Sequence, residues 1–259
     1  MTKFVAVVSA KGGVGKTTTT INLSSALDWF KRDVIVLDAN FTNPDVGIYL
    51  GAPFKEKTFH TALKGNHHIK ESIYRHPSGL KIISGNISFK EAVRARRENI
   101  VDVIQGLTNL SEIVLIDSSP GIGGDCRAVL KAVDYVLVIT TPDVCSVANT
   151  IKIINLAKEY NKQILGIVVN KHRGEEYELD TNNIQTMTGQ KVIGIIPQDS
   201  SVRLSMHNKN PLLITHPEGE ASIGFKKLAS QLIGEQYVVN IEKEPQKTNF
   251  KDIIRRFGF

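Results

Sequence analysis

Cysteine is scarce in this sequence: only Cys126 and Cys145 occur in 259 residues, and they form no Cys-x-x-Cys pair. Two such distant cysteines exclude a disulfide framework, a zinc ribbon and a cysteine-ligated cluster held within one chain. The low cysteine content therefore favours a reducing compartment.

Long apolar runs are missing as well. Nowhere do about 18 apolar residues follow one another, so no segment is expected to span a bilayer. The first residues lead directly into a glycine-rich loop, unlike a secretory signal peptide, and we expect no secretion. A net charge of +6 admits nucleic acid, an anionic membrane or an acidic partner without choosing among them.

Short β-branched runs alternate with helical patterns along most of the chain. Several of these runs are apolar at consecutive positions, which is typical of parallel strands buried on both faces by crossover helices. The pattern predicts an α/β fold with a doubly wound, mostly parallel sheet flanked by helices. The predicted strands are 3–8, 33–38, 80–84, 112–117, 135–140, 163–170 and 191–196, and the predicted helices are 16–31, 91–107, 125–132, 145–160, 177–187 and 221–234.

A glycine-rich loop follows the first predicted strand and precedes a helical run. It contains Lys11, Gly12, Gly13, Val14, Gly15, Lys16, Thr17 and Thr18. Small residues let backbone N–H groups surround phosphate oxygens, and the following helix directs its partial positive charge at them. Lys16 would neutralise the β- and γ-phosphates, and the Thr17 hydroxyl would bind Mg²⁺. Ala10 stands where the common P-loop pattern has its first glycine.

This loop resembles that of the deviant Walker A ATPases, the MinD/ParA family, which carry a second lysine at the start of the loop. Lys11 occupies that position here. The resemblance implies a P-loop NTPase fold of the SIMIBI type, with ATP and Mg²⁺ as cofactors. It also implies an ATP-dependent homodimer in which Lys11 reaches the phosphates of the other subunit.

Further landmarks of the family follow in order. The segment 114–121 resembles the Walker B strand and second switch, which places Asp117 beside Mg²⁺. By the same resemblance Asn170 reads adenine, and Pro197 and Asp199 belong to a late loop beside the base. Cys126 raises the iron–sulfur branch of the superfamily, but no second suitably placed cysteine accompanies it.

The first switch departs from the usual pattern. It reads Asp38-Ala39-Asn40, whereas MinD and ParA proteins usually have a second aspartate in the position of Asn40. Asparagine in this position is similar to archaeal MinD-like branches. An amide orients water but does not accept its proton as a carboxylate does. We therefore expect slow hydrolysis. Asp38 is assigned to the Mg²⁺ and water shell with Thr17 and Asp117, and the catalytic set is Lys11, Lys16, Asp38, Asn40 and Asp117.

The end of the chain has a different character. Phe250, Ile253, Ile254 and Phe257 form one apolar stripe at helical spacing, with Lys251, Arg255 and Arg256 beside it. These features are typical of a helix that lies in a membrane interface. The sequence predicts a P-loop ATPase domain at 1–237, a polar tether at 238–248 and an amphipathic membrane-targeting helix at 249–259. Docking of this helix on the protein itself or on a partner is the alternative.

Together these features predict a MinD-like ATPase that dimerises on ATP and binds an anionic membrane surface. It would be cytoplasmic and peripheral on the inner face of the cell membrane, and slow ATP hydrolysis would release it. Such a cycle would organise cell division or another polar apparatus through an unidentified protein partner or activator. The alternative is a ParA-like or flagellar-number-type ATPase that acts on DNA or a transcription partner.

Overall fold

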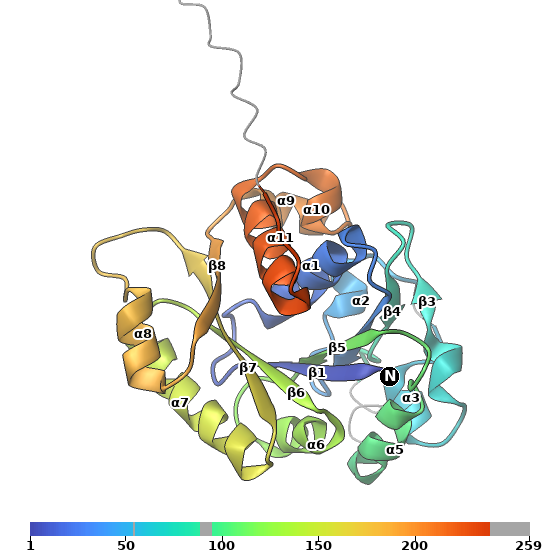
Figure 1. The fold of residues 1–259 in the computed structure, drawn as a ribbon. Coiled ribbons are helices and arrows are strands. Elements are labelled where there is room, and N and C mark those ends of the chain that lie inside the picture. The colour runs from blue at the N-terminus through green and yellow to red at the C-terminus, as the bar shows by residue number, and fades with distance from the viewer. Residues whose placement is uncertain (54, 89–94, 239–259) are drawn as a thin grey trace, which may run out of the picture.

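The computed structural model describes residues 1–53, 55–88 and 95–238. Within them, one sheet has eight strands in the order β3-β4-β2-β5-β1-β6-β7-β8 (Figure 1). The strands are β1 (Lys3–Val8), β2 (Val34–Ala39), β3 (Tyr74–Arg75), β4 (Lys81–Ile83), β5 (Ile113–Ser118), β6 (Tyr135–Thr140), β7 (Gln163–His172) and β8 (Val192–Pro197). All neighbours are parallel except β3 and β4. The predicted α/β class and mostly parallel sheet are confirmed.

Helices cover both faces of this sheet (Figure 1). One face carries α1 (Lys16–Trp29), α2 (Val46–Tyr49), α9 (Ser201–His207), α10 (Leu212–Thr215) and α11 (Glu220–Ile233). The other carries α3 (Phe59–Leu63), α5 (Ile100–Gln105), α6 (Gly124–Ala132), α7 (Val144–Glu159) and α8 (Thr181–Thr188). Two short 3₁₀ helices lie at Ile69–Ser72 and Arg97–Asn99.

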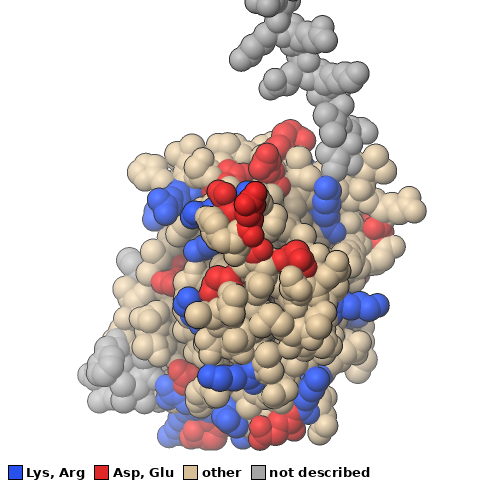
Figure 2. Space-filling model, turned by 90° about the vertical axis from the view of Figure 1, so that its left-hand side faces the viewer, with Lys and Arg blue, Asp and Glu red and all other residues tan. Residues whose placement is uncertain are grey.

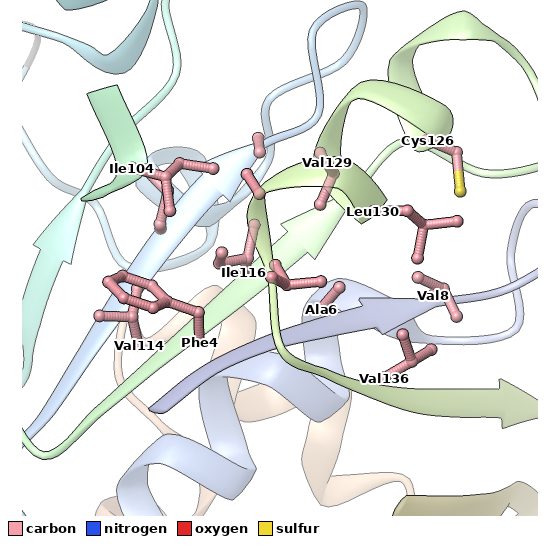
Figure 3. Packing of buried hydrophobic residues seen from close by; sticks show 14 of the residues in the cluster. Phe4, Ala6, Val8, Ile104, Val114, Ile116, Cys126, Val129, Leu130 and Val136 are labelled. Atoms are coloured by element: carbon pink, nitrogen blue, oxygen red, sulfur yellow. The ribbon is translucent and has the colours of Figure 1, made fainter. Parts of the chain in front are cut away.

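The alternation of side chains along β1 explains why a continuous apolar run is needed. Phe4, Ala6 and Val8 pack toward the face of α5 and α6 (Figure 3). Val5 and Val7 belong instead to the cluster beneath α1 and α11. Because both faces are covered, each residue of such a strand gains from being apolar.

Several predicted boundaries were wrong. The predicted helix 91–107 is, within the described residues, only the 3₁₀ turn Arg97–Asn99 followed by α5, and Arg97 is held there by an ion pair of 2.6 Å with Asp125. The predicted helix 177–187 begins at Thr181, because the Asp180 carboxylate caps it through Asn183 N. Upstream of this cap, the Glu178 carboxylate accepts backbone N–H bonds that fold the segment into a loop.

Within the described residues, five short elements were not predicted besides the 3₁₀ helix Ile69–Ser72, namely β3, α2, α3, α9 and α10. None of the four helices is longer than seven residues, and β3 has two, so their sequences complete too few periods to be recognised. Among the described residues, no helix is both long and apolar enough to cross a membrane. Apart from Val238, the predicted tether and the whole of the predicted helix 249–259 lie outside the described residues.

Candidate phosphate-binding site

The glycine-rich loop connects the carboxyl end of β1 to the first turn of α1. Gly13 and Gly15 have φ values of 79° and 95°, which favour glycine. A Cβ on Gly15 would also run into the side-chain amide of Asn170. Gly15 caps α1 without a side-chain hydrogen bond, and the first turn of α1 carries no acidic residue. The helix N-terminus therefore keeps N–H groups and positive potential for an anion.

Lys16 lies at the start of α1 and is only 7% exposed. Burial lowers the pKa of its ammonium, and the negative charges of Asp117 and Asp45 oppose that shift. No hydrogen bond or ion pair joins the Lys16 ammonium to another described residue. A buried cation is costly without a partner, so the environment of Lys16 fits a bound anion.

Two buried carboxylates face the same end of the sheet. Asp38 on β2 and Asp117 on β5 are register partners, and both side chains are fully buried. Burial raises the pKa of Asp117 to about 6, although the Thr17 hydroxyl and Lys16 oppose this. Burial, reinforced by the charge of Asp117, raises the pKa of Asp38 well above its usual range. Within the described part of the chain, Asp38 thus has no compensating positive charge, and Lys16 compensates Asp117 only in part.

The Thr17 hydroxyl donates a hydrogen bond of 2.5 Å to Asp117 Oδ2. The other oxygen, Asp117 Oδ1, is buried and has no hydrogen-bond partner among the described residues. Carboxylate and hydroxyl oxygens are the ligands that Mg²⁺ prefers, with the rest of its shell taken from water or phosphate. The residues therefore fit a divalent cation, which would neutralise the buried pair.

The loop after β2 is organised around Asp38 and Asn40. Asp38 accepts backbone N–H bonds from Asn40 at 3.1 Å and Val46 at 3.0 Å. Asn40 is 6% exposed, and its Oδ1 accepts bonds from Asn43 N and from Ser119 Oγ. Ser119 follows β5, so this contact joins the loop after β2 to the loop after β5. Ser119 was not predicted as a site residue, because only the fold brings it beside Asn40.

Lys11 is exposed at the outer side of the glycine-rich loop. Its charge acts on Asp143, the residue that caps α7. Burial opposes the change, but hydrogen bonds from Thr141 and Ser146 and the charge of Lys11 lower the pKa of Asp143. Lys11 is thus separate from the buried Lys16 and faces outward, where another molecule can approach.

The end of β7 holds the glycine-rich loop in place. Asn170 Nδ2 donates a bond of 2.7 Å to the Val14 carbonyl, and Lys171 Nζ donates one of 2.7 Å to the Gly13 carbonyl. Asn170 is 5% exposed, so its bond to Val14 is shielded from water. The family resemblance assigns Asn170 to adenine, and the structure adds a contact between Asn170 and the glycine-rich loop.

A small pocket of about 170 Å³ adjoins this contact. Asn170, Pro197 and Asp199, which were predicted beside a base, line it together with Thr18 of the glycine-rich loop. The rest of the lining comprises Lys171, Ile196, Gln198, Val202, Arg203, Met206 and Phe225, and the last four of these were not predicted from the sequence. Three of these lie on the unpredicted helix α9.

The Asp199 carboxylate in this pocket accepts hydrogen bonds from two neighbouring elements. Its carboxylate accepts bonds from Ser201 N at 2.8 Å, Ser201 Oγ at 2.5 Å and Ala221 N at 3.2 Å. Burial opposes them, but these bonds lower the pKa of Asp199. Asp199 therefore ties the starts of α9 and α11 to the loop after β8.

The two cysteines do not form a metal site. Burial raises the pKa of the Cys126 thiol to about 11, despite the nearby charge of Lys16, so this residue is a neutral core side chain. Cys145 is exposed on α7. Within residues 1–53, 55–88 and 95–238, no group of three or more His, Cys, Asp or Glu side chains is arranged to hold a metal ion.

Comparisons with known proteins agree with this geometry. Residues 1–233 match the family model described as ParA, NUBPL iron-transfer P-loop NTPase. An uncharacterized ATP-binding protein of Methanocaldococcus jannaschii is 33% identical, over 98% of this chain and 96% of its own length. The septum site-determining protein MinD of Synechocystis is 26% identical, over 91% of each chain.

A comparison with solved structures also finds similarity to MinD. The septum site-determining protein MinD of Pyrococcus horikoshii, complexed with Mg-ADP, superposes with a TM-score of 0.86 at 26% identity. The match covers 90% of this chain and 96% of the other. The resemblance based on the glycine-rich loop is confirmed, and the chain belongs to the ParA family of P-loop NTPases, similar in sequence and structure to MinD septum site-determining proteins.

Proposed function

We propose that this protein is a MinD-like ATPase that binds ATP with Mg²⁺, dimerises on it and uses a membrane surface to organise cell division or another polar apparatus. The observation that carries the proposal is the buried, unpartnered Lys16 beside the buried carboxylates of Asp38 and Asp117. Such buried charges are retained where a ligand completes the site, here an anionic phosphate for the lysine and a bound cation for the carboxylates.

In this proposal Lys16 and the N–H groups of residues 12–18 hold the phosphates. Thr17, Asp38 and Asp117 hold the cation directly or through water. Mg²⁺, when bound, draws charge from the β- and γ-phosphate oxygens. Asn170 and Pro197 border the base, while Asp199 supports the wall of that pocket through its bonds to α9 and α11.

Asn40 would orient the attacking water. Its Oδ1 is held by Ser119 and Asn43, which fixes the amide at the end of the sheet. An amide has no capacity to take the proton, so the rate would depend on positioning and on the charge supplied by Lys16. Slow hydrolysis follows, which suits a timed switch.

Lys11 would act between two subunits. It is exposed, whereas Lys16 is buried within its own loop, so only Lys11 is free to reach a neighbouring nucleotide. A cation supplied across an interface stabilises phosphate charge and makes association depend on the nucleotide. Two C-terminal segments on one dimer would then bind anionic lipid by avidity, where one segment binds weakly.

The competing function places the ATPase on DNA. A non-specific DNA surface needs a concentration of Lys and Arg on one face. Figure 2 shows basic and acidic side chains intermingled on the side that faces the viewer, with a broad area free of both. This face offers no single-sign basic patch for such binding.

The test removes residues 247–259 and measures co-sedimentation with vesicles that contain phosphatidylglycerol, in ATP and in ADP. We expect the full chain to sediment in ATP, with a loss of at least about tenfold in ADP or after truncation. Equal sedimentation of full and truncated chains would reject the membrane role. Salt-dependent DNA binding by both would then support the competing function.

A further inference from the structure

A second and larger cavity lies at the opposite end of the sheet from the glycine-rich loop. It has a volume of about 780 Å³ and is bordered by the first residues of β1, β5, β6 and β7. The ends of α1 and α11 close its sides through Leu27, Leu232 and Ile233. We call this cavity the amino-edge groove.

The groove is an uncovered extension of the core beneath α1 and α11. Val5, Leu115 and Leu137 form its floor and are buried. Nearer the strand starts, Ile113, Tyr135 and Leu165 pack against the same cluster but remain only partly buried. Because α1 ends at Trp29 and α11 at Ile233, no described element covers these side chains. An apolar occupant would remove them from water.

One polar group on the rim of the groove has no hydrogen-bond partner among the described residues. It carries the cations Lys3 and Arg32 and the acids Asp33 and Glu112. Arg32 contacts Glu112 at 3.6 Å, and Asp33 pairs with Lys81 at 2.7 Å. Arg32 Nε is buried and has no hydrogen-bond partner among the described residues. Buried donors are nearly always paired, so this N–H calls for an acceptor on an occupant.

The described chain ends beside this groove. Leu232 and Ile233 line it, and Glu235 forms an ion pair of 2.7 Å with Arg32. Tyr237 then packs against Trp29 and Phe30 at the end of α1. The next residues, 239–248, reach at most roughly 33–36 Å when extended. This length is sufficient to return residues 249–259 to a cavity that begins at Ile233.

The sequence of that segment matches the groove. Phe250, Ile253, Ile254 and Phe257 recur at i, i+3, i+4 and i+7, which would present one apolar stripe to an apolar cavity. Lys251, Arg255 and Arg256 flank the stripe. The exposed carboxylates of Asp33 and Glu112 on the rim are the groups that would face such cations.

We propose that residues 249–259 dock in the amino-edge groove of their own chain when no membrane is present. The same apolar stripe serves the groove and the lipid, so the two contacts exclude each other. Docking would hold the segment back from membranes until a dimer offers two of them at once. The contact itself requires neither nucleotide nor lipid, and only its regulatory consequence rests on the proposed function.

The experiment measures hydrogen exchange of the nucleotide-free full chain in solution, without vesicles. The test variant is Phe257→Asp, which places a charge in the stripe, and the matched control is Asp252→Asn, which lies off the stripe and is not among the cations assigned to the rim. We expect peptides covering residues 109–113, 133–137 and 231–237 to exchange at least about tenfold faster in Phe257→Asp than in the control. Peptides from α7 should be unchanged in both.

Equal exchange of these peptides in the two variants would overturn the proposal, whatever the vesicle assay gives. Protection that disappears on dilution would also overturn it, because the occupant would then be a second copy.

A substitution in the groove itself provides an independent test of the proposal. Ile233→Lys should raise vesicle binding in ADP several-fold, and a second variant, Leu165→Lys, should repeat the effect if Ile233→Lys does not fold. Unchanged binding by a folded groove variant would remove the regulatory role.

Discussion

Asn40 is the residue at which this protein departs most clearly from the usual chemistry of its family. Its Oδ1 is already committed to Ser119 and Asn43, so the amide is a fixed part of the site. An aspartate at this position would accept the same two hydrogen bonds and add a proton acceptor.

The substitution Asn40→Asp is therefore expected to raise ATP turnover at saturating Mg²⁺ and ATP by at least about tenfold. The measurement is steady-state phosphate release, with Asn40→Ala as the control that removes both the amide and its hydrogen bonds. Turnover that stays the same in Asn40→Asp would show that proton acceptance at this position does not limit the reaction.

Asp117 gives a prediction on stability. Burial raises its pKa to about 6 in the folded protein, against about 3.9 in an unfolded chain. A carboxyl group with a raised pKa favours the folded state at low pH, and this contribution is lost as pH rises from about 4 to about 6. At neutral pH the ionised Asp117 therefore destabilises the nucleotide-free protein.

Asp117→Asn should raise the unfolding free energy of the nucleotide-free protein at neutral pH by on the order of 2 kcal/mol. The thermal midpoint should rise with it. The difference from the unsubstituted chain should shrink as the pH is lowered through about 6. Thermal denaturation at several pH values measures this, and the same variant should lose stabilisation by Mg²⁺ with ATP. A difference independent of pH would contradict the assignment.

At the scale of elements, the junction of β1, the glycine-rich loop and α1 depends on β7. Gly15 has a φ of 95° and lies against the Asn170 amide, so a side chain here meets backbone strain and a steric clash together. Gly12 has open space around its Cα and no left-handed φ.

Gly15→Ala is expected to destabilise the protein by at least about 2 kcal/mol, because the left-handed backbone and the clash both oppose a Cβ. The matched variant Gly12→Ala should change the unfolding free energy by less than about 0.5 kcal/mol. Chemical denaturation of both, without nucleotide, makes the comparison. Equal losses would mean that the contact with Asn170 is dispensable.

The predictability of elements followed their length. The apolar runs of β2 and β5 identify buried strands, because each residue of a doubly covered strand is selected for the same property. The short helix α9 carries no such pattern, although Val202, Arg203 and Met206 complete the wall of the small pocket. Its position depends on Asp199, whose bond from Ser201 is local but whose bond from Ala221 forms only when β8 and α11 are adjacent.

At the scale of the whole molecule, the proposed switch requires two subunits. Lys11 is exposed on the phosphate end of the sheet, and the amino-edge groove lies at the other end. Association through Lys11 and docking in the groove therefore use opposite ends of one subunit, which lets the two events be separated by substitution.

Lys11→Ala should abolish the ATP-dependent dimer and leave ATP binding by the monomer within about threefold, because Lys16 supplies the cation within the chain. Mass measurement by light scattering in ATP with Mg²⁺ detects the dimer, and Lys64→Ala, away from the loop, is the control. A dimer of full stability in Lys11→Ala would refute the role across the interface.

The sequence by itself determined the features that depend on neighbours along the chain. These local features are the glycine spacing that bends the loop, the lysine and threonine that begin α1, and the apolar runs of the central strands. Each can be interpreted from the sequence without knowledge of the fold. The tertiary structure alone decided which distant groups meet. It places Asp38 beside Asp117 in the register of β2 and β5. It also brings Asn170 within hydrogen-bond distance of Val14 and Asn40 within that distance of Ser119, and it leaves the amino-edge groove open. These contacts depend on strand order and register, which arise from the packing of the whole sheet and are not encoded in any single segment.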